Sequence, residues 1–432
     1  MEQKTDGASA PTSTLGRRRW LIVALLFAAT VINYVDRQMI GVLKPTLSQD
    51  LGWSEGNFAD VIFYFTMAYG AGFLAFGKIM DFIGTRRGYA FSFVIWQIAH
   101  IAHGLASSVL QFSVARFALG IGEAGNFPAA IKAVTEWFPA RERAFAIGIF
   151  NAGSNVGAIL TPLIVPVIAL AYGWRAAFVV TGVLSFTWLV AWLITYRSPA
   201  DDQKLKAGEL AWIEQDPEQS SRPLPWSKVL RTRETWAFAL GKFFIDPIWW
   251  FFLFWLPGYL GERYGLDLLS FGPPLVAIYL LSDIGSVVGG WLSSRLISRG
   301  ATVNFARKVT MLVCAVVVLP VLGVQSVDTL WTAVLIIGLA TAAHQAFSAN
   351  LYAIVPDIFP RAAVGSVIGI GGTAGAIGGM VMAKYAGYVL ESLHSYAPLF
   401  AVAGSAYFVA LMAVQLISPK LSRAHLNEAQ PS

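Results

Sequence analysis

Long apolar stretches separated by short polar segments run through nearly the whole chain. A helix of about 20 apolar residues is long enough to cross the hydrocarbon core of a bilayer. Counted in this way, the pattern predicts an all-α membrane protein with twelve transmembrane helices. The predicted spans are 20–43, 57–80, 89–106, 109–131, 143–168, 176–196, 236–260, 271–293, 307–323, 328–350, 363–388 and 397–417.

The longest polar segment, 197–235, lies between the sixth and the seventh predicted span. It contains many charged residues but no recognisable catalytic motif, so we interpret it as a linker with one short surface helix near Glu209–Gln215. The predicted domains are a cytoplasmic tail at 1–19, a six-helix bundle at 20–196, the cytoplasmic linker at 197–235, a second six-helix bundle at 236–418 and a cytoplasmic tail at 419–432.

The two predicted bundles share sequence motifs at a constant offset along the chain. Glu136-Trp-Phe-Pro139 corresponds to Asp357-Ile-Phe-Pro360, and Gly148-Ile149 corresponds to Gly369-Ile370. Such a repeat implies two six-helix halves related by a pseudo-twofold axis along the membrane normal. A binding site is then expected between the halves, near the middle of the bilayer.

Composition supports the membrane interpretation, because 56% of the residues are hydrophobic and only 13% are charged. Most arginines and lysines outside the spans fall on the side of the N-terminus, beginning with 17–19. Only Lys44, Arg175 and Arg263 fall on the opposite side. The positive-inside rule therefore predicts that both termini lie in the cytoplasm, and we expect the protein in the cell (inner) membrane. This topology explains the net charge of +6, so no nucleic-acid partner is expected.

Two predicted spans contain pairs of charged residues well inside their apolar runs. Asp36 and Arg37 are adjacent in the first span, and Arg116 and Glu123 lie seven residues apart in the fourth. Seven residues make about two helical turns, or about 10 Å, so Arg116 and Glu123 share one face. A charge in the bilayer costs about 3 kcal/mol or more, which favours a binding site over chance. The alternative is that Asp36 and Arg37 only neutralise each other within the helix packing.

The types of residue in the spans fit an anionic sugar. A guanidinium group binds a carboxylate through two parallel hydrogen bonds, which suits Arg37 and Arg116 as anion ligands. Asp246 lies inside the seventh span, directly before the helix-bending Pro247. The candidate ligands for hydroxyl groups and the sugar face are Tyr34, Tyr69, Asn126, Asp246, Trp249, Trp250, Gln345 and Asn350. For each aromatic residue taken singly, packing against the core or lipid remains the alternative.

One loop motif resembles a known family. The pattern Gly-x-x-x-Asp-x-x-Gly-x-Arg-Arg, formed by Gly77, Asp81, Gly84, Arg86 and Arg87, is similar to the signature loop of the major facilitator superfamily. The resemblance implies the major facilitator fold and transport by alternating access. Asp81, near a helix end, would pair with basic groups and form a latch that breaks when the halves move.

A narrower resemblance points to the anion:cation symporters of that superfamily, and among them to hexuronate transporters. It depends on 33–37, Arg116, 122–128, 246–257, 343–345 and the glycine-rich 369–379. Phe252 and Phe347 depart from the hexuronate pattern, where Tyr and Trp are expected, but both keep the aromatic character.

These observations predict a proton-coupled symporter that imports a monoanionic sugar acid, galacturonate or glucuronate. In the empty carrier Asp36 and Glu123 would neutralise the arginines, and a substrate carboxylate would replace an acid only once that acid is protonated. We expect Glu123 to be the essential proton carrier, and Asp36 to be either the second carrier or the organiser of Arg37. The alternatives are a symporter for an aldonate such as galactonate, or a receptor that binds the same ligand without transporting it.

The predicted partners are a small carboxylate, protons and the lipid bilayer. We expect a monomer with no metal and no cofactor, and no enzymatic activity, because the sequence contains no catalytic constellation.

Overall fold

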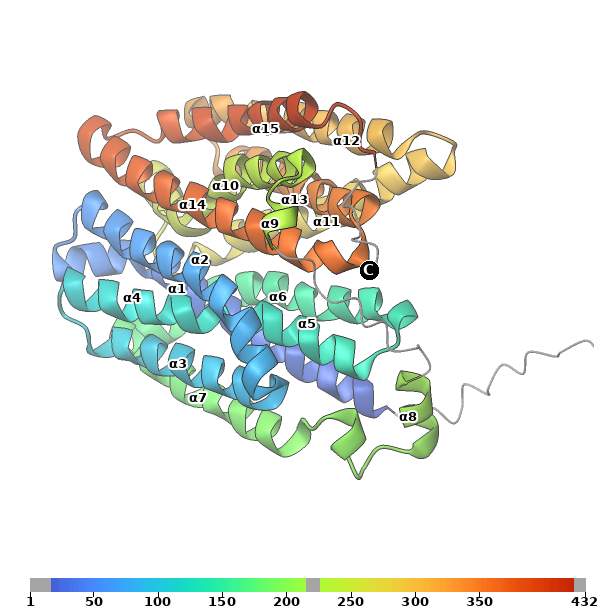
Figure 1. Cartoon of the computed structure of the whole chain (residues 1–432). Helices are drawn as coiled ribbons and strands as arrows, with labels where there is room; N and C mark the ends of the chain where they lie inside the picture. The colour runs from blue at the N-terminus through green and yellow to red at the C-terminus, as the bar shows by residue number, and fades with distance from the viewer. Residues whose placement is uncertain (1–16, 215–225, 423–432) are drawn as a thin grey trace, which may run out of the picture.

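The computed structural model describes residues 17–214 and 226–422, and within these ranges every regular element is helical. Figure 1 shows the helices that precede the linker as one group and those that follow it as a second group packed against the first. The helices are α1 (Arg18–Leu51), α2 (Glu55–Ile83), α3 (Thr85–Leu105), α4 (Val109–Glu123), α5 (Asn126–Trp137), α6 (Ala140–Tyr172), α7 (Trp174–Thr195), α8 (Ala207–Ile213), α9 (Trp226–Val229), α10 (Arg233–Tyr264), α11 (Gly272–Ser298), α12 (Val303–Val318), α13 (Leu330–Ile358), α14 (Arg361–Leu393) and α15 (Ala397–Ile417), with short 3₁₀ helices η2 (Pro199–Asp201) and η3 (Leu319–Ser326).

Ten helices of the described chain are long and apolar enough to cross a membrane, judged by length and composition. The all-helical membrane fold is therefore confirmed. The predicted third span corresponds to α3, which carries two arginines and several polar residues, and the fourth corresponds to α4 and α5. Neither is among the ten, so the count of twelve spans stays a prediction.

The structure repeats at the offset found in the sequence. Helices α6 and α14 begin directly after Pro139 and Pro360, the last residues of the two matching motifs, and they have the same length. The segment 109–137, from the start of α4 to the end of α5, matches α13 in the same register. The two halves therefore use the same helices in the same order, except that one span of the first half is broken.

That break corrects the prediction of one continuous helix over 109–131. Helix α4 ends at Glu123, and α5 begins at Asn126. Pro128 lacks a backbone N–H and its ring clashes with the carbonyl group four residues earlier, at Ala124. Pro128 therefore removes the helical hydrogen bond to Ala124, and α4 ends directly before Ala124, at Glu123.

Helix α1 is longer than the predicted 20–43, because it continues through Pro45 and ends only at the glycine cap Gly52. Gly52 has φ 66°, and its N–H donates to the carbonyl of Ser48. Lys44, expected in a loop, therefore lies inside α1, where its Nζ is 2.7 Å from Glu55 Oε1. The ninth predicted span, 307–323, differs too, since α12 changes to the 3₁₀ helix η3 near its end.

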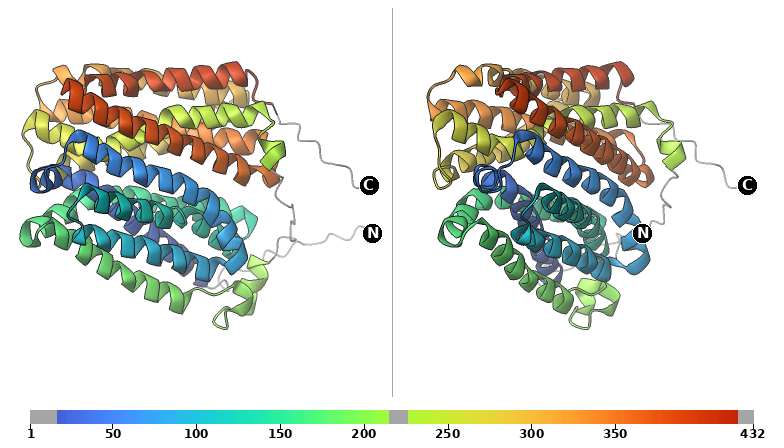
Figure 2. Two further views of the ribbon diagram at one scale, coloured as in Figure 1. Left: turned by 60° about the vertical axis from the view of Figure 1, so that its left-hand side comes forward. Right: turned by 90° about the vertical axis from the view of Figure 1, so that its left-hand side faces the viewer.

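The two halves contact each other mainly through the helix pairs α2 with α14, α1 with α10, and α6 with α11. Figure 2 shows α2 and α14 side by side in both views. The halves are close at the end of the molecule where α1 terminates. There Asp60 of α2 forms an ion pair with Lys384 of α14, and Gly387 packs so closely against Ala59 that a Cβ would not fit.

At the opposite end, the first part of the linker is attached to the start of α1. Arg18 Nε is 2.9 Å from Asp202 Oδ2, and Arg19 Nη1 is 3.2 Å from Glu209 Oε1. Helix α8 matches the expected surface helix, although Gln215 lies outside the described residues. The domain boundaries themselves remain predictions.

Candidate functional site

A buried ion pair joins α1 to the broken end of α4. Arg37 Nε donates to Glu123 Oε2 at 2.8 Å, and Arg37 Nη2 donates to Asn33 Oδ1 at 3.0 Å. The side chains of Arg37 and Glu123 are only 5% and 0% exposed. Removing one partner of a buried ion pair leaves an uncompensated charge. Arg37 and Glu123 therefore each compensate the buried charge of the other.

Aromatic rings surround the Arg37 guanidinium group. Its central carbon lies 5.0 Å from the ring centre of Tyr34, 4.6 Å from that of Tyr69 and 5.6 Å from that of Trp250. Tyr34 and Tyr69 belong to the first half, whereas Trp250 belongs to α10 in the second. The charged pair therefore lies at the junction of the halves, where the sequence repeat predicted a site.

Arg116 is completely buried next to this pair. Its Nη2 donates to the backbone carbonyl of Arg37 at 2.9 Å. Its Nε and Nη1 have no hydrogen-bond partner among the residues that the structure describes. The guanidinium carbon lies 5.1 Å from the ring centre of Phe65 and 6.0 Å from that of Phe254. Buried donors without acceptors are costly, and an anion could supply the missing acceptors, so the role of Arg116 as an anion ligand stays a prediction.

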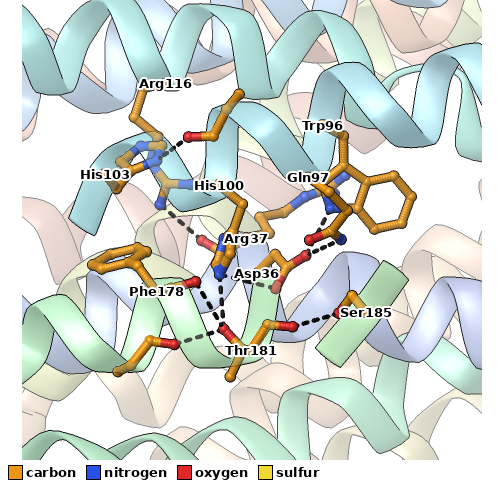
Figure 3. Close-up of polar contacts among 12 residues, drawn as sticks. Asp36, Arg37, Trp96, Gln97, His100, His103, Arg116, Phe178, Thr181 and Ser185 are labelled. Carbon is orange, nitrogen blue, oxygen red and sulfur yellow. Dashed lines mark hydrogen bonds and ion pairs between the residues drawn. The ribbon is translucent and has the colours of Figure 1, made fainter. Parts of the chain in front are cut away.

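Asp36 turns away from Arg37 and faces α3, as Figure 3 shows. Its Oδ2 accepts hydrogen bonds from Trp96 Nε1 at 2.7 Å and Gln97 Nε2 at 2.8 Å, and its Oδ1 lies 3.3 Å from His100 Nε2. The expectation that Asp36 neutralises an arginine directly is therefore wrong in this conformation. Adjacent residues on a helix point about 100° apart, so Asp36 and Arg37 enter different surroundings.

Sequence reasoning missed the partners of Asp36 on α3. Trp96, His100 and His103 are separated by four and three residues, which places them on one face of the helix. Polar side chains at this spacing, within an apolar run, are the feature of the sequence that could have indicated the partners of Asp36.

In the second half, Asp246 has a partner that sequence reasoning also missed. Lys242 Nζ lies 2.6 Å from Asp246 Oδ1, one helical turn away on α10. The same ammonium group lies 4.2 Å from the ring centre of Tyr352. The spacing of four residues was visible in the sequence. Asp246 is thus a member of an ion pair and not an isolated buried acid.

The remaining predicted ligands differ in position. Trp249 stacks on His344 with ring centres 5.4 Å apart, and Gln345 is half-buried beside it in the sequence. Asn126 is buried within the first half and bonded to Tyr89, and Asn350 is buried within the second and donates to two backbone carbonyls. These asparagines already have partners away from Arg37, so their role in binding substrate stays a prediction without geometric support.

The predicted latch is only partly described. Gly84 has φ 80°, a value that favours glycine, and forms the turn between α2 and α3. Arg86 donates to a backbone carbonyl of α7, and Arg87 is exposed. The surroundings of Gly77 and the side chain of Asp81 lie outside the described part of the structure, so the latch stays a prediction.

A repeated helical bundle with charges buried at the junction of its halves is the architecture of a membrane transport protein. The chain matches the Major Facilitator Superfamily over residues 26–382, and it belongs to that family. This family is not enzymatic, and the chain is a multi-pass membrane transporter.

Two transporters and one solved structure are similar to this chain. The hexuronate transporter of Escherichia coli (strain K12) is 32% identical over 391 residues, covering 89% of this chain and 90% of that protein. The galacturonate transporter of Dickeya chrysanthemi is 34% identical over 280 residues, covering 63% and 81% respectively. A bacterial homologue of the human lysosomal transporter Spinster has the same fold, with a TM-score of 0.71, 16% identity and coverage of 94% and 96%.

The contacts of Trp250 and Trp249 allow a paired test. Trp250→Ala is expected to weaken substrate binding about tenfold, because an aromatic or cation–π contact away from water is worth about 1–2 kcal/mol. Trp249→Ala, which removes the ring stacked on His344, should weaken binding less. Calorimetric titration of the purified variants measures both effects. Equal losses in the two variants, or losses that only follow the yield of folded protein, would contradict the assignment.

Proposed function

We propose that the protein is a proton-coupled symporter that imports a monoanionic sugar acid, with galacturonate or glucuronate as substrate. The observation that carries the proposal is the buried Arg37–Glu123 ion pair at the junction of the halves. The unpartnered donors of Arg116 lie beside it, and the aromatic rings around Arg37 provide flat faces for a sugar. The names of the two transporters similar to this chain support the substrate class.

The ion pair provides the coupling step. While Glu123 is ionised, it occupies the Arg37 donor that a substrate carboxylate needs. A proton on Glu123 removes its charge and weakens the pair, and the substrate carboxylate then becomes the counterion of Arg37. Substrate and proton therefore bind together. Asp36, on the other side of α1, would carry a second proton.

The number of protons determines how the membrane potential acts. Moving one negative charge inward against an interior-negative potential costs about 2.3 kcal/mol per 100 mV. One proton makes the cycle electroneutral, whereas two protons allow the potential to drive uptake.

For the movement between states, we propose that bundles 20–196 and 236–418 rock about the site, with both termini in the cytoplasm. The halves are packed at the end where α1 terminates, and this end would then be the closed outer side. The Asp60–Lys384 ion pair links α2 to α14 at this end.

Asp60→Asn is expected to favour opening at this end by up to about fivefold, because an exposed ion pair contributes about 0.2–1 kcal/mol. Distances between spin labels on α2 and α14 measure the opening. The exchanged pair, Asp60→Lys with Lys384→Asp, should restore the wild-type distances. Wild-type distances in Asp60→Asn alone would show that the ion pair does not hold the halves together.

The function itself is tested with purified protein in liposomes. Labelled galacturonate should accumulate when protons are more concentrated outside than inside. Binding without accumulation would indicate a receptor. A panel of uronates and aldonates, including galactonate, in a thermal-shift assay would identify the preferred substrate, and a preference for galactonate would replace hexuronate in the proposal.

A further inference from the structure

We propose that His100 and Asp36 together form the second proton-binding site of the transporter, and that His103 extends this site along α3. The inference rests on the proposed proton-coupled transport. It concerns the contact between Asp36 of α1 and the part of α3 that carries His100 and His103, which Figure 3 shows.

The first observation is a set of buried polar atoms without partners. His100 and His103 are completely buried, and Asp36 is 1% exposed. His100 Nδ1, His103 Nε2 and Asp36 Oδ1 have no hydrogen-bond partner among the described residues. Buried polar atoms are nearly always bonded, so three exceptions in one cluster call for an explanation.

The hydrogen bonds of the neighbours determine which nitrogen of His100 carries hydrogen. The Thr181 hydroxyl donates to the carbonyl of Ala177 at 2.7 Å. It therefore accepts from His100 Nε2, which lies 2.9 Å away. His100 Nδ1 therefore carries no hydrogen and has a free lone pair. The hydrogen on Nε2 points between Thr181 and Asp36.

The same argument applies to His103. Its Nδ1 donates to the carbonyl of Ala99 at 2.7 Å, so its unpartnered Nε2 is a bare acceptor. The cluster thus contains two basic nitrogens and one carboxylate oxygen, all acceptors. An added proton supplies the donor that the cluster lacks, which is what a proton-binding site requires.

A balanced transfer follows from this geometry. A proton binds to His100 Nδ1, and an N–H bond forms there. The Nε2–H bond breaks, and its proton forms an O–H bond with Asp36 Oδ1, 3.3 Å away. The carboxylate becomes neutral, and the imidazole remains neutral in its other tautomer until the transfer reverses or the ring rotates. The ring centres of His100 and His103 are 6.4 Å apart, so the second imidazole lies next to the first along α3.

The charged groups that face this site connect it to the substrate. The positive charge of Arg116 on α4 acts on both imidazoles, and the negative charge of Glu123 acts on Asp36. Thr181 of α7 and the side chains of Trp96 and Gln97 on α3 are uncharged. A cation at Arg116 opposes a nearby proton, and a substrate carboxylate bound to Arg116 removes that opposition. Substrate binding thus favours proton binding at the His100–Asp36 site.

The test is His100→Gln in liposomes, with two measurements. Uptake driven by a pH gradient alone should persist, because Glu123 still carries one proton. Uptake driven by the membrane potential, and the substrate-induced current on a supported membrane, should fall at least about tenfold, because one proton with one monoanion moves no net charge. His103→Gln should slow the current without changing the charge moved per substrate.

The control is His394→Gln in the second half. His394 is exposed and lies directly after α14, outside the site. This variant should keep the wild-type current. A wild-type current in His100→Gln overturns the inference, and so does an electroneutral wild-type protein.

These outcomes differ from a failure of the proposed function, in which the wild-type protein does not accumulate substrate under any proton gradient. If His100→Gln does not yield folded protein, Thr181→Val removes the hydroxyl that accepts from His100 Nε2. The pH at which the current is half-maximal should then shift. An unchanged pH profile in Thr181→Val would overturn the inference.

Discussion

Arg37→Lys is expected to reduce proton-driven uptake of galacturonate by about 30- to 100-fold, although the positive charge is kept. The Arg37 guanidinium uses Nε for Glu123 and Nη2 for Asn33 while it lies among aromatic rings. A lysine ammonium is a point charge and does not reproduce this planar fork. Losing a charge-assisted hydrogen bond costs about 2–3 kcal/mol, which corresponds to the stated range. Uptake into liposomes and calorimetric binding measure the effect.

Arg116→Lys should show a loss of similar size, because its free Nε and Nη1 are the proposed carboxylate donors. Arg263→Lys is the matched control. Arg263 Nη2 is 2.9 Å from Asp328 Oδ1 at the exposed end of α10, away from the site, so its replacement should leave substrate binding close to that of the wild type. Undiminished binding in both Arg37→Lys and Arg116→Lys would mean that neither arginine binds the substrate carboxylate.

Glu123→Gln is expected to separate substrate exchange from proton coupling. Glutamine is neutral at any pH, so the variant resembles the protonated carrier, in which Arg37 is available to the substrate. Exchange of internal for external galacturonate should therefore persist. Accumulation driven by a proton gradient should disappear, because the essential proton has no site. Counterflow and gradient-driven uptake in the same liposomes measure the two activities.

Asp36→Asn provides the comparison. It should keep accumulation driven by a pH gradient, since Glu123 remains. If Glu123→Gln still concentrates substrate with a normal pH dependence, the essential proton is carried elsewhere. Asp36, Asp246 and His344 are then the candidates in that order.

The helices and the repeat could be predicted from the sequence, because the length of apolar runs and the spacing of motifs do not depend on how the helices pack. Apolar runs longer than a bilayer core predict helices without knowledge of packing. The constant offset between the repeated motifs reappears in the bounds of α6 and α14. The break after Glu123 was also present in the sequence as Pro128, but a hydropathy count ignores the backbone donor that proline lacks.

The sequence by itself determined that four charged residues, Asp36, Arg37, Arg116 and Glu123, lie within apolar helices, since burial of these segments follows from their composition. Only the tertiary structure decided which charges meet. Arg37 pairs with Glu123 from α4, whereas Asp36 faces His100 of α3. The partners come from different helices, and their choice depends on how those helices rotate and pack. Spacing along one helix carries no information about that rotation.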